Sequence, residues 1–222
     1  MSRITTHWQE VLATLPEGVT LVAVSKTKPV EAIEELYQVG QRVFGENRVQ
    51  ELVAKEEVLP KDMEWHMIGH LQTNKVKYVA PFVSLIHGVE SARLLEAVNR
   101  EGERHRRVIP CLLQFHIATE ESKFGLDWPE ACQLLESESY RGMQNIRIAG
   151  VMGMATFTEN ERQVRREFAQ LRQWFEGLKK AYFAEDAGFR EVSMGMSGDY
   201  RVAIEEGSTM VRVGSSIFGQ RY

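Results

Sequence analysis

The sequence predicts an α/β protein folded as a single (β/α)8 barrel with a short helix before the first strand. Short runs rich in β-branched residues alternate eight times with longer segments whose apolar residues recur at helical spacing. Strands that alternate with helices indicate a parallel sheet with the helices outside it. The 222 residues suffice for eight such units, which places the chain at the lower size limit for this barrel.

The predicted elements follow one another in a regular order. The eight strands cover residues 21–25, 42–45, 64–68, 84–88, 108–116, 147–152, 191–194 and 210–213. A helix at residues 6–15 precedes them, and helical segments follow the first seven strands at residues 29–40, 48–59, 74–82, 91–105, 128–139, 160–183 and 198–207. Pro29 opens the first of these segments and Gly40 closes it, as helix-end preferences predict.

A doubly wound open sheet is the rival fold. Its glycine fingerprint would follow the first strand, where this chain instead carries Ser-Lys-Thr-Lys-Pro. No linker, low-complexity segment or tandem repeat interrupts the alternation. We therefore expect one barrel domain over residues 1–222.

Composition argues against several classes of partner. The formal net charge is −4, whereas nucleic-acid binders usually concentrate positive charge, so we expect no nucleic-acid partner. No apolar run approaches the roughly 20 residues that span a bilayer, and the N-terminus carries no apolar signal core. Cys111 and Cys132 show no metal spacing and no pairing pattern, which suits a reducing compartment. We expect a cytoplasmic protein without a membrane partner, with Cys111 as a core residue.

Lys26 is the first candidate for chemistry, because active sites of (β/α)8 barrels lie at the carboxyl ends of the strands. It follows the first strand and shares a face with Val22 and Val24 by the two-residue alternation. If that face points inward, desolvation lowers the pKa of the lysine and gives the nucleophilic amine that Schiff-base chemistry uses. The alternative is a lysine that extends to solvent. Lys28 competes for the role, but Pro29 begins a helix there, so we expect Lys28 to point away.

The loops after the seventh and eighth strands have the composition of an anion site. They contain Met-Ser-Gly-Asp and Gly-Ser-Ser, and phosphates in such barrels frequently bind between these two loops. Small residues let backbone N–H groups converge on an anion, and the hydroxyls of Ser197 and Ser215 can add donors. The alternative is ordinary turn chemistry, with Ser197 or Asp199 as a helix N-cap.

Arg212 interrupts an apolar strand and shares a face with Met210. A guanidinium there stays charged and offers only hydrogen-bond donors. Two interpretations stay open, namely a buried ion pair with Glu46 or Asp199, and a donor to a heteroatom of a ligand.

Other patterns favour no additional chemistry. The sequence has no P-loop, no Gly-x-Ser-x-Gly and no His-Glu-x-x-His. His66 and His70 are four residues apart across a strand and its loop, so we predict no metal site. Glu120, Glu121 and Lys123 are interpreted as a charged loop.

Five sequence blocks, in this order, are similar to those of a known family. They are AVSKTKP, FGENRVQE, WHMIGHLQTNK, VSMGMSGDYRVAI and GSTMVRVGSSIFGQR. Together they resemble the pyridoxal 5′-phosphate (PLP) homeostasis proteins of PROSC type, from about residue 20 to the C-terminus. The resemblance implies a fold-type III PLP barrel, like the N-terminal domain of alanine racemase, with PLP as the cofactor.

The resemblance also implies roles for individual residues. Lys26 would hold PLP as a Schiff base, Asn47 would line the face of its ring, and Arg212 would stand opposite the pyridine nitrogen. These roles match what PLP needs from a protein, which is an amine for the aldehyde, a cradle for the phosphate and a partner for the ring nitrogen. Because an arginine cannot take up a proton, the ring nitrogen should stay unprotonated.

The phosphate would be bound by the seventh and eighth loops. The residues implied there are Met196 through its backbone, Ser197, Gly214 and Ser215. Two positions depart from the family pattern, because His116 stands where the family usually has Asn and Thr156 where a proline is common. These departures concern the access of the ligand more than the binding of the cofactor.

The predicted function is that of a carrier, which holds PLP, limits the free aldehyde and passes the cofactor to apo PLP-dependent enzymes. The alternative is an enzyme similar to an amino-acid racemase. Racemases of this fold take a second acid–base residue from an additional β-domain and a dimer partner, whereas the barrel uses almost this whole chain. A site open to water disfavours carbanion chemistry, so we expect a non-catalytic monomer. A third class, a Schiff-base aldolase for a phosphorylated sugar, would use the same lysine and phosphate site without a yellow cofactor.

Overall fold

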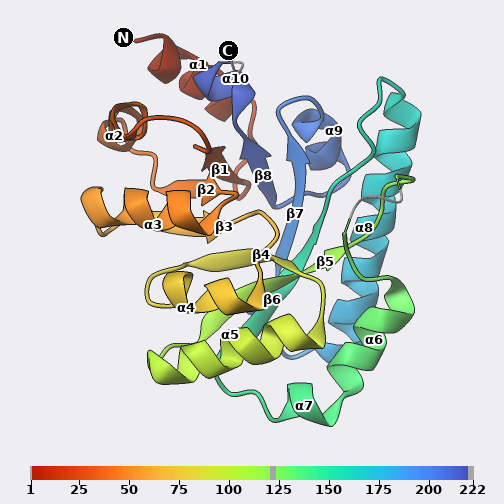
Figure 1. The fold of residues 1–222 in the computed structure, drawn as a ribbon. Coiled ribbons are helices and arrows are strands. Elements are labelled where there is room, and N and C mark those ends of the chain that lie inside the picture. Colours follow the sequence, from red (N-terminus) through yellow and green to blue (C-terminus); the bar gives the residue numbers. More distant parts are fainter. Residues whose placement is uncertain (1, 121–123, 220–222) are drawn as a thin grey trace.

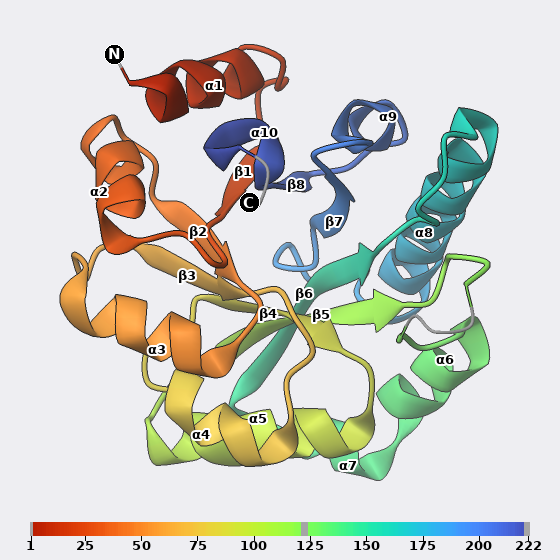
Figure 2. The ribbon, with the colours of Figure 1, turned by 45° about the horizontal axis from the view of Figure 1, so that its top comes forward.

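The computed structural model describes residues 2–120 and 124–219, and within them eight parallel strands form a closed barrel (Figure 1). Each strand pairs with the next along the chain, and the last pairs with the first, so that Thr20 lies beside Met210. Figure 2 shows the helices standing around the outside of the strands. The predicted (β/α)8 barrel is confirmed, and the open-sheet alternative is wrong because an open sheet would leave its first and last strands unpaired.

Strands and helices alternate along the described residues. The strands are β1 (Thr20–Val24), β2 (Val43–Glu46), β3 (Glu64–Met67), β4 (Leu85–Val89), β5 (Ile109–Phe115), β6 (Ile146–Gly153), β7 (Glu191–Met196) and β8 (Met210–Val213). The helices are α1 (Arg3–Leu12), α2 (Val30–Gln38), α3 (Val49–Val58), the 3-10 turn η1 (Thr73–Lys75), α4 (Val76–Val79), α5 (Ala92–Arg104), α6 (Trp128–Glu136), α7 (Glu138–Arg141), α8 (Glu161–Tyr182), α9 (Tyr200–Glu205) and α10 (Ser215–Phe218).

The predicted strands are all present, and their ends differ from the observed ones by at most two residues. The helices differ more. The N-terminal helix begins at Arg3 because the Ser2 hydroxyl accepts the Thr5 N–H at 3.3 Å and caps it there. The segment predicted as one helix at residues 128–139 is divided in two, because Ser137 takes an extended conformation and its hydroxyl caps α7 at the Tyr140 N–H.

The apolar core has two parts, as the alternation of side chains along each strand requires. The larger part fills the space between the strands and the surrounding helices. The smaller part fills the inside of the barrel, and its buried members are Val22, Leu85, Leu112, Ala149, Met152 and Met210. Because these side chains fill it, the interior is a packed core and not a channel. Full burial of a Val, Leu or Met side chain contributes about 1.5–3 kcal/mol to folding.

The first and last helices of the described chain lie side by side. Figure 1 shows α1 and α10 together near both ends of the chain, and α1 also packs against α2. Trp8 on α1 is buried, and its indole Nε1 donates to Gln41 Oε1 at 2.8 Å. The Gln41 amide in turn donates to the Leu21 carbonyl on β1 at 2.9 Å. The N-terminal helix is thus tied to the strand that precedes Lys26.

Candidate functional site

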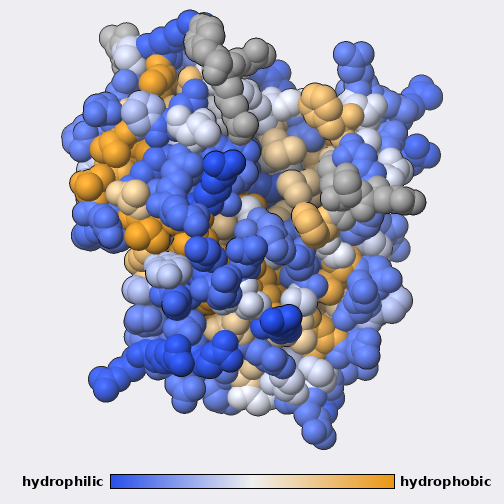
Figure 3. Space-filling view, viewed as in Figure 1, coloured by the Kyte–Doolittle hydropathy of each residue, from blue (hydrophilic) through white to orange (hydrophobic). Residues whose placement is uncertain are grey.

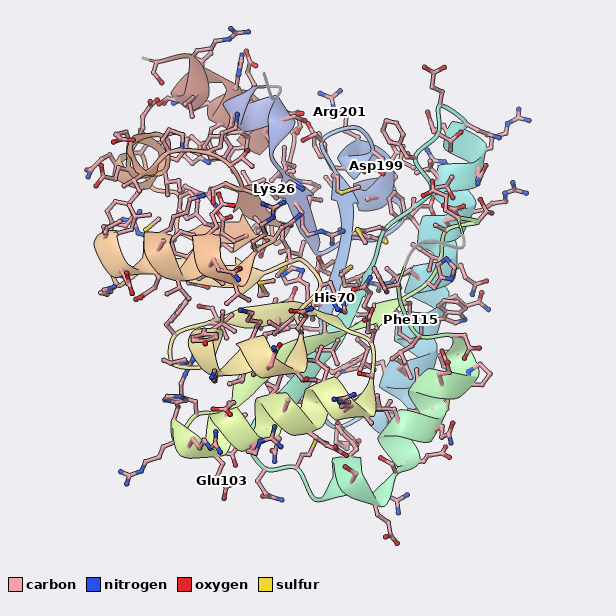
Figure 4. All side chains as sticks on the ribbon, in the orientation of Figure 1. Lys26, His70, Glu103, Phe115, Asp199 and Arg201 are labelled. Carbon is pink, nitrogen blue, oxygen red and sulfur yellow. The ribbon has the colours of Figure 1, made fainter. Side chains whose placement is uncertain are left out.

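Lys26 lies directly beyond β1, at the carboxyl end of the barrel. Val22 belongs to the apolar cluster inside the barrel, and a Cβ placed on Gly214 would stand 3.2 Å from the Val24 Cβ. Lys26 continues this inward face by the alternation, and the residue is half-buried. Figure 4 shows Lys26 on the same side of the barrel as Asp199, which follows another strand. The inward orientation that was predicted for β1 is present.

Lys28, the competing lysine, is engaged elsewhere. Its amine donates to the carbonyls of Phe218 and Gly219 at 3.1 and 3.3 Å, at the end of α10. This agrees with the expectation that Lys28 points away from the interior. It also ties the loop after β1 to the last described helix.

Asn47 and Glu46 face opposite sides of β2. A Cβ on Gly45 would lie 2.8 Å from Val22 Cγ1, so Gly45 faces the barrel interior, and Asn47 continues that face two residues later. Glu46 therefore points outward, where its carboxylate pairs with Lys55 at 2.7 Å. The predicted ion pair between Arg212 and Glu46 is wrong for this reason.

Arg212 lies inside the barrel, as its shared face with Met210 predicts, and is 4% exposed. Its guanidinium donates to the Ser193 carbonyl at 2.9 Å, to the Ser193 hydroxyl at 2.5 Å and to the Gly153 carbonyl at 3.1 Å. Burial lowers the pKa of Arg212 to about 10, and the carboxylate of Asp199 acts in the opposite direction. The arginine thus stays charged at neutral pH and is held by β6 and β7, with Asp199 as an electrostatic neighbour.

Two histidines extend this polar layer across the barrel, and the sequence analysis did not identify them as interior residues. His87 Nδ1 lies 3.0 Å from the Ser193 hydroxyl, and His87 Nε2 lies 3.0 Å from His66 Nδ1. Burial lowers the pKa of His66 to about 3 and that of His87 well below its ordinary value, so both rings are neutral at pH 7. The signal in the sequence is the two-residue spacing of His87 from Leu85, which faces the interior.

The loops after β7 and β8 meet at the hydroxyl of Ser197. This oxygen accepts the N–H of Gly214 at 3.2 Å and the N–H of Ser216 at 3.3 Å. Two backbone donors from one loop therefore converge on one oxygen of the other. Such a donor pair is how barrels of this kind bind a phosphate oxygen. Ser215 begins α10 between these donors and is exposed.

The loop after β7 combines this convergence with ordinary turn chemistry. Asp199 is the N-cap of α9, and its carboxylate accepts the Met196 N–H at 2.6 Å. The helices that begin here are short, with six residues in α9 and four in α10, so single N–H groups matter more than a helix dipole. Gly195 has a φ of 95°, and a Cβ there would lie 2.6 Å from the Ala203 Cβ, so only glycine lets α9 pack this close to β7.

The two positions that depart from the family pattern have structural partners. The Thr156 N–H donates to Glu167 at 2.6 Å, a bond that the proline common at this position could not make. His116 Nε2 lies 2.9 Å from the Glu120 carbonyl. Glu121 and Lys123 lie outside the described residues, so the charged loop stays a prediction.

The rim of the barrel brings together aromatic and charged side chains from neighbouring loops. His70 Nδ1 lies 3.0 Å from Glu90, and its ring stacks on Phe124 with centroids 5.1 Å apart. Among exposed apolar side chains, Phe124 follows β5, Phe157 follows β6 and Met196 ends β7. On the face drawn in Figure 3, hydrophilic side chains cover most of the surface and hydrophobic ones form smaller patches.

Cys111 is fully buried in the core between strands and helices, and burial raises the pKa of its thiol, which confirms it as a core residue. Over residues 2–120 and 124–219, no three His, Cys, Asp or Glu side chains gather as a set of metal ligands. Within the same ranges, no helix has the length and apolar character that crossing a membrane requires.

Relatives of this chain include proteins named for pyridoxal phosphate homeostasis. The family model described as alanine racemase, N-terminal domain, matches residues 1–222. The pyridoxal phosphate homeostasis protein of Aquifex aeolicus is 40% identical over 202 residues, covering 90% of this chain and 86% of that protein. The Escherichia coli K12 protein of the same name is 38% identical over 213 residues, covering 93% and 87%.

Solved structures of similar proteins have the same fold. PipY of Synechococcus elongatus, solved with PLP bound, has a TM-score of 0.84 and 35% identity, covering 97% of this chain and 100% of that one. The alanine racemase of Bartonella henselae has a TM-score of 0.73 at 17% identity, covering 98% of this chain but 58% of the racemase, and shows the fold alone. The chain belongs to the alanine racemase N-terminal domain family and, within it, to the pyridoxal phosphate homeostasis proteins.

Proposed function

We propose that this protein binds PLP at the carboxyl end of its barrel as a Schiff base on Lys26, and that it stores and delivers the cofactor. The observation that carries the proposal is the donor pair at Ser197, where two backbone N–H groups meet beside the inward face that ends in Lys26. Backbone N–H groups that converge in this way, beside a hydroxyl, suit a phosphate oxygen. PipY, a relative of 35% identity, was solved with PLP bound.

The residues at this end of the barrel fit the three parts of the cofactor. The neutral amine of Lys26 would add to the aldehyde carbon, forming a C=N bond with the loss of one water molecule. The hydroxyl of Ser197 and the N–H groups of the loop after β8 would hold phosphate oxygens, with Met196, Gly214 and Ser215 in the same two loops. When bound, PLP would supply an aldehyde that exchanges between amines.

Arg212 and Asn47 complete the proposed site. The Arg212 guanidinium carries only donors, so it suits an unprotonated pyridine nitrogen and cannot protonate it. His66 and His87, which lie behind Ser193, are neutral and add no second positive charge beside Arg212 inside the barrel. A pyridine nitrogen kept neutral withdraws electrons more weakly than one that is protonated beside an aspartate. Asn47, on the inward face of β2, would contact the ring.

The carrier role is favoured over catalysis by the relatives. Proteins named for PLP homeostasis match this chain over 86% and 87% of their length in Aquifex aeolicus and Escherichia coli, whereas the Bartonella racemase is matched over 58%. We propose a non-catalytic, monomeric, cytoplasmic protein that acts as one domain and delivers PLP to apo PLP-dependent enzymes. A racemase-like activity is the second candidate, and the shared fold is the observation behind it.

The proposal is tested by the absorbance of the purified protein after PLP is added. Wild type should show the yellow band of a Schiff base, and Lys26→Ala should not. Lys28→Ala is the matched control, because Lys28 lies two residues away with its amine on the Phe218 and Gly219 carbonyls, and it should keep the band. A wild type that stays colourless after excess PLP has been added and the unbound part removed would overturn the cofactor assignment and favour the aldolase alternative.

Carrier and enzyme are separated by two further measurements on the loaded protein. Transfer is measured as the recovery of activity when the loaded protein is mixed with an apo PLP-dependent enzyme. Catalysis is measured as racemisation of amino acids by circular dichroism. Racemisation with a turnover number of about 1 per second or more, typical of enzymes, would contradict the carrier role.

A further inference from the structure

The loop that carries Lys26 has an unusual backbone conformation. Thr27 has a φ of 65°, in the left-handed region that β-branched residues rarely adopt. A residue is held in this conformation only where its surroundings enforce it. Such strain is often found beside functional groups, and Thr27 directly follows Lys26. The contacts that enforce this conformation are therefore of interest.

On one side of Lys26, the loop is held through Ser25. The Lys55 amine, on α3, donates to the Ser25 carbonyl at 2.8 Å. The Ser25 hydroxyl donates to Glu46 Oε1 at 2.6 Å, and Lys55 donates to the same oxygen at 2.7 Å. Ser25 and Glu46 are fully buried, and Lys55 is 6% exposed. Ser25, which leads into Lys26, is thus held by two charged groups, Lys55 at its carbonyl and Glu46 at its hydroxyl.

On the other side of Lys26, the loop is held through Thr27. Its N–H donates to Glu51 Oε1 at 2.5 Å, and this oxygen accepts from Lys55 at 2.7 Å. Glu51 and Lys55 are four residues apart on α3, so one helix face presents both groups to the loop. A single amine therefore links the anchors before and after Lys26.

This cluster is costly if its only purpose is stability. Glu46 Oε2 is buried without a hydrogen-bond partner among the described residues, and burial raises the pKa of Glu46 against the effect of Lys55. Buried ion pairs of this kind are often no more stabilising than apolar side chains of similar size. What charges provide, and apolar side chains do not, is directional bonds to particular peptide groups.

We propose that Lys55, together with Glu46 and Glu51, is a positioning residue that fixes the backbone on both sides of Lys26 and so sets where its amine stands. The inference rests on the proposed function, because it concerns the formation of the Schiff base. It assigns the cluster no contact with PLP. Loss of the cluster should therefore slow the formation of the Schiff base by the Lys26 amine and leave the noncovalent binding of PLP unchanged.

The test uses the full chain with Glu51→Ala and Lys55→Met. Glu56→Ala is the matched control, because Glu56 also lies on α3, pairs with Lys61 and has a side chain 19% exposed, against 23% for Glu51. The rate of Schiff-base formation should fall about tenfold in both test variants, since a misplacement of about 1 Å can cost up to 100-fold. Glu51→Gln retains an oxygen for the Thr27 N–H and should restore most of the rate.

Noncovalent binding is measured by calorimetry with PLP in a Lys26→Ala background. Adding Glu51→Ala there should leave the affinity unchanged, because the proposal gives Glu51 no contact with PLP. Lys55→Met leaves Glu46 buried without its partner; if that variant does not fold in a circular-dichroism melt, Glu51→Ala decides alone. Wild-type rates in folded test variants, or an equal loss in Glu56→Ala, would overturn this inference only. A colourless wild type would overturn the proposed function as well.

Discussion

His66 and His87 make the stability of this protein depend on pH in a predictable direction. Burial holds the pKa of His66 at about 3 and that of His87 well below its usual range, while a histidine in the unfolded chain titrates near 6.5. Below that pH the unfolded state binds more protons than the folded state. The free energy of unfolding therefore has its full value above pH ~6.5. Below that pH it decreases, by up to about 1.4 kcal/mol per pH unit for each histidine.

This first prediction is checked by denaturant unfolding at several pH values between about 5 and 7, with and without His66→Gln. In His66→Gln, the unfolding free energy should change less steeply with pH than in wild type, by up to about 1.4 kcal/mol per pH unit. His105→Gln, at the exposed end of α5, should keep the wild-type slope. Equal slopes in wild type and His66→Gln would contradict a neutral, buried His66. Comparing variants also removes the opposite contribution of Glu46, whose pKa is raised.

Ser197 offers a prediction about the phosphate alone. Its hydroxyl is the oxygen on which the N–H groups of Gly214 and Ser216 converge. Ser197→Ala removes a donor to the phosphate, and a hydrogen bond to a charged group contributes about 1.5–3 kcal/mol, so the affinity for PLP should fall at least about tenfold. The affinity for pyridoxal, which lacks the phosphate, should stay unchanged. Equal losses for both ligands would show that Ser197 acts on the ring or on the fold.

Helix α9 packs closely on β7, and this contact depends on Gly195. Gly195→Ala places a methyl group 2.6 Å from the Ala203 Cβ and strains a φ of 95°. We expect the variant to lose about 1–3 kcal/mol of unfolding free energy and to bind PLP more weakly, because the phosphate loop must shift.

Gly142→Ala is the control for this variant. A Cβ there would be no closer than 3.6 Å to its neighbours, so the change should be nearly neutral. Both variants are compared by denaturant unfolding and PLP titration. A Gly195→Ala protein as stable as Gly142→Ala would show that α9 does not need to pack so closely.

Which elements the sequence could predict depends on how local their causes are. Strands and long helices follow from periodicity within a few residues, so β8 agrees at both ends with its prediction. The division between α6 and α7 depends on one serine in an extended conformation, and periodicity does not reveal it. The common location of Lys26 and the loops after β7 and β8 was predictable, because a barrel puts the carboxyl ends of all its strands together.

The remaining site residues depend on neighbours that are distant in the sequence. An ion pair of Arg212 with Glu46 was left open as one interpretation, although Asn47 and Glu46 cannot both face inward on one strand. Lys55 reaches the Ser25 carbonyl because α3 packs on β2 and β3, an arrangement that no local pattern of residues encodes. His87 and Ser193 meet across the barrel, 106 residues apart in the chain.

At the scale of the whole molecule, the proposed site joins the two ends of the chain. β1 and β8 are neighbours, so Lys26 and the loop after β8 stand side by side in one closed sheet. PLP at about 100 times its dissociation constant should add about 2.7 kcal/mol to the free energy of unfolding. The melting temperature should then rise by about 5–10 °C in wild type, as judged from 2–4 °C per kcal/mol for domains of this size.

Scanning calorimetry with and without PLP checks this prediction. Lys28→Ala should show the full increase in melting temperature, and Lys26→Ala a smaller one, because only noncovalent contacts remain. An equal increase in Lys26→Ala would mean that the Schiff base adds no binding energy.

The closure of the barrel also has a consequence during synthesis on the ribosome. Lys26 is translated early, but the donors of Gly214 and Ser216 exist only after β8 has been made and has joined β1. On the proposed function, a nascent chain holds an exposed lysine without the cradle that would retain the aldehyde. Binding of PLP would then begin only when translation has passed β8, so unfinished chains would not reduce the PLP that is free in the cell.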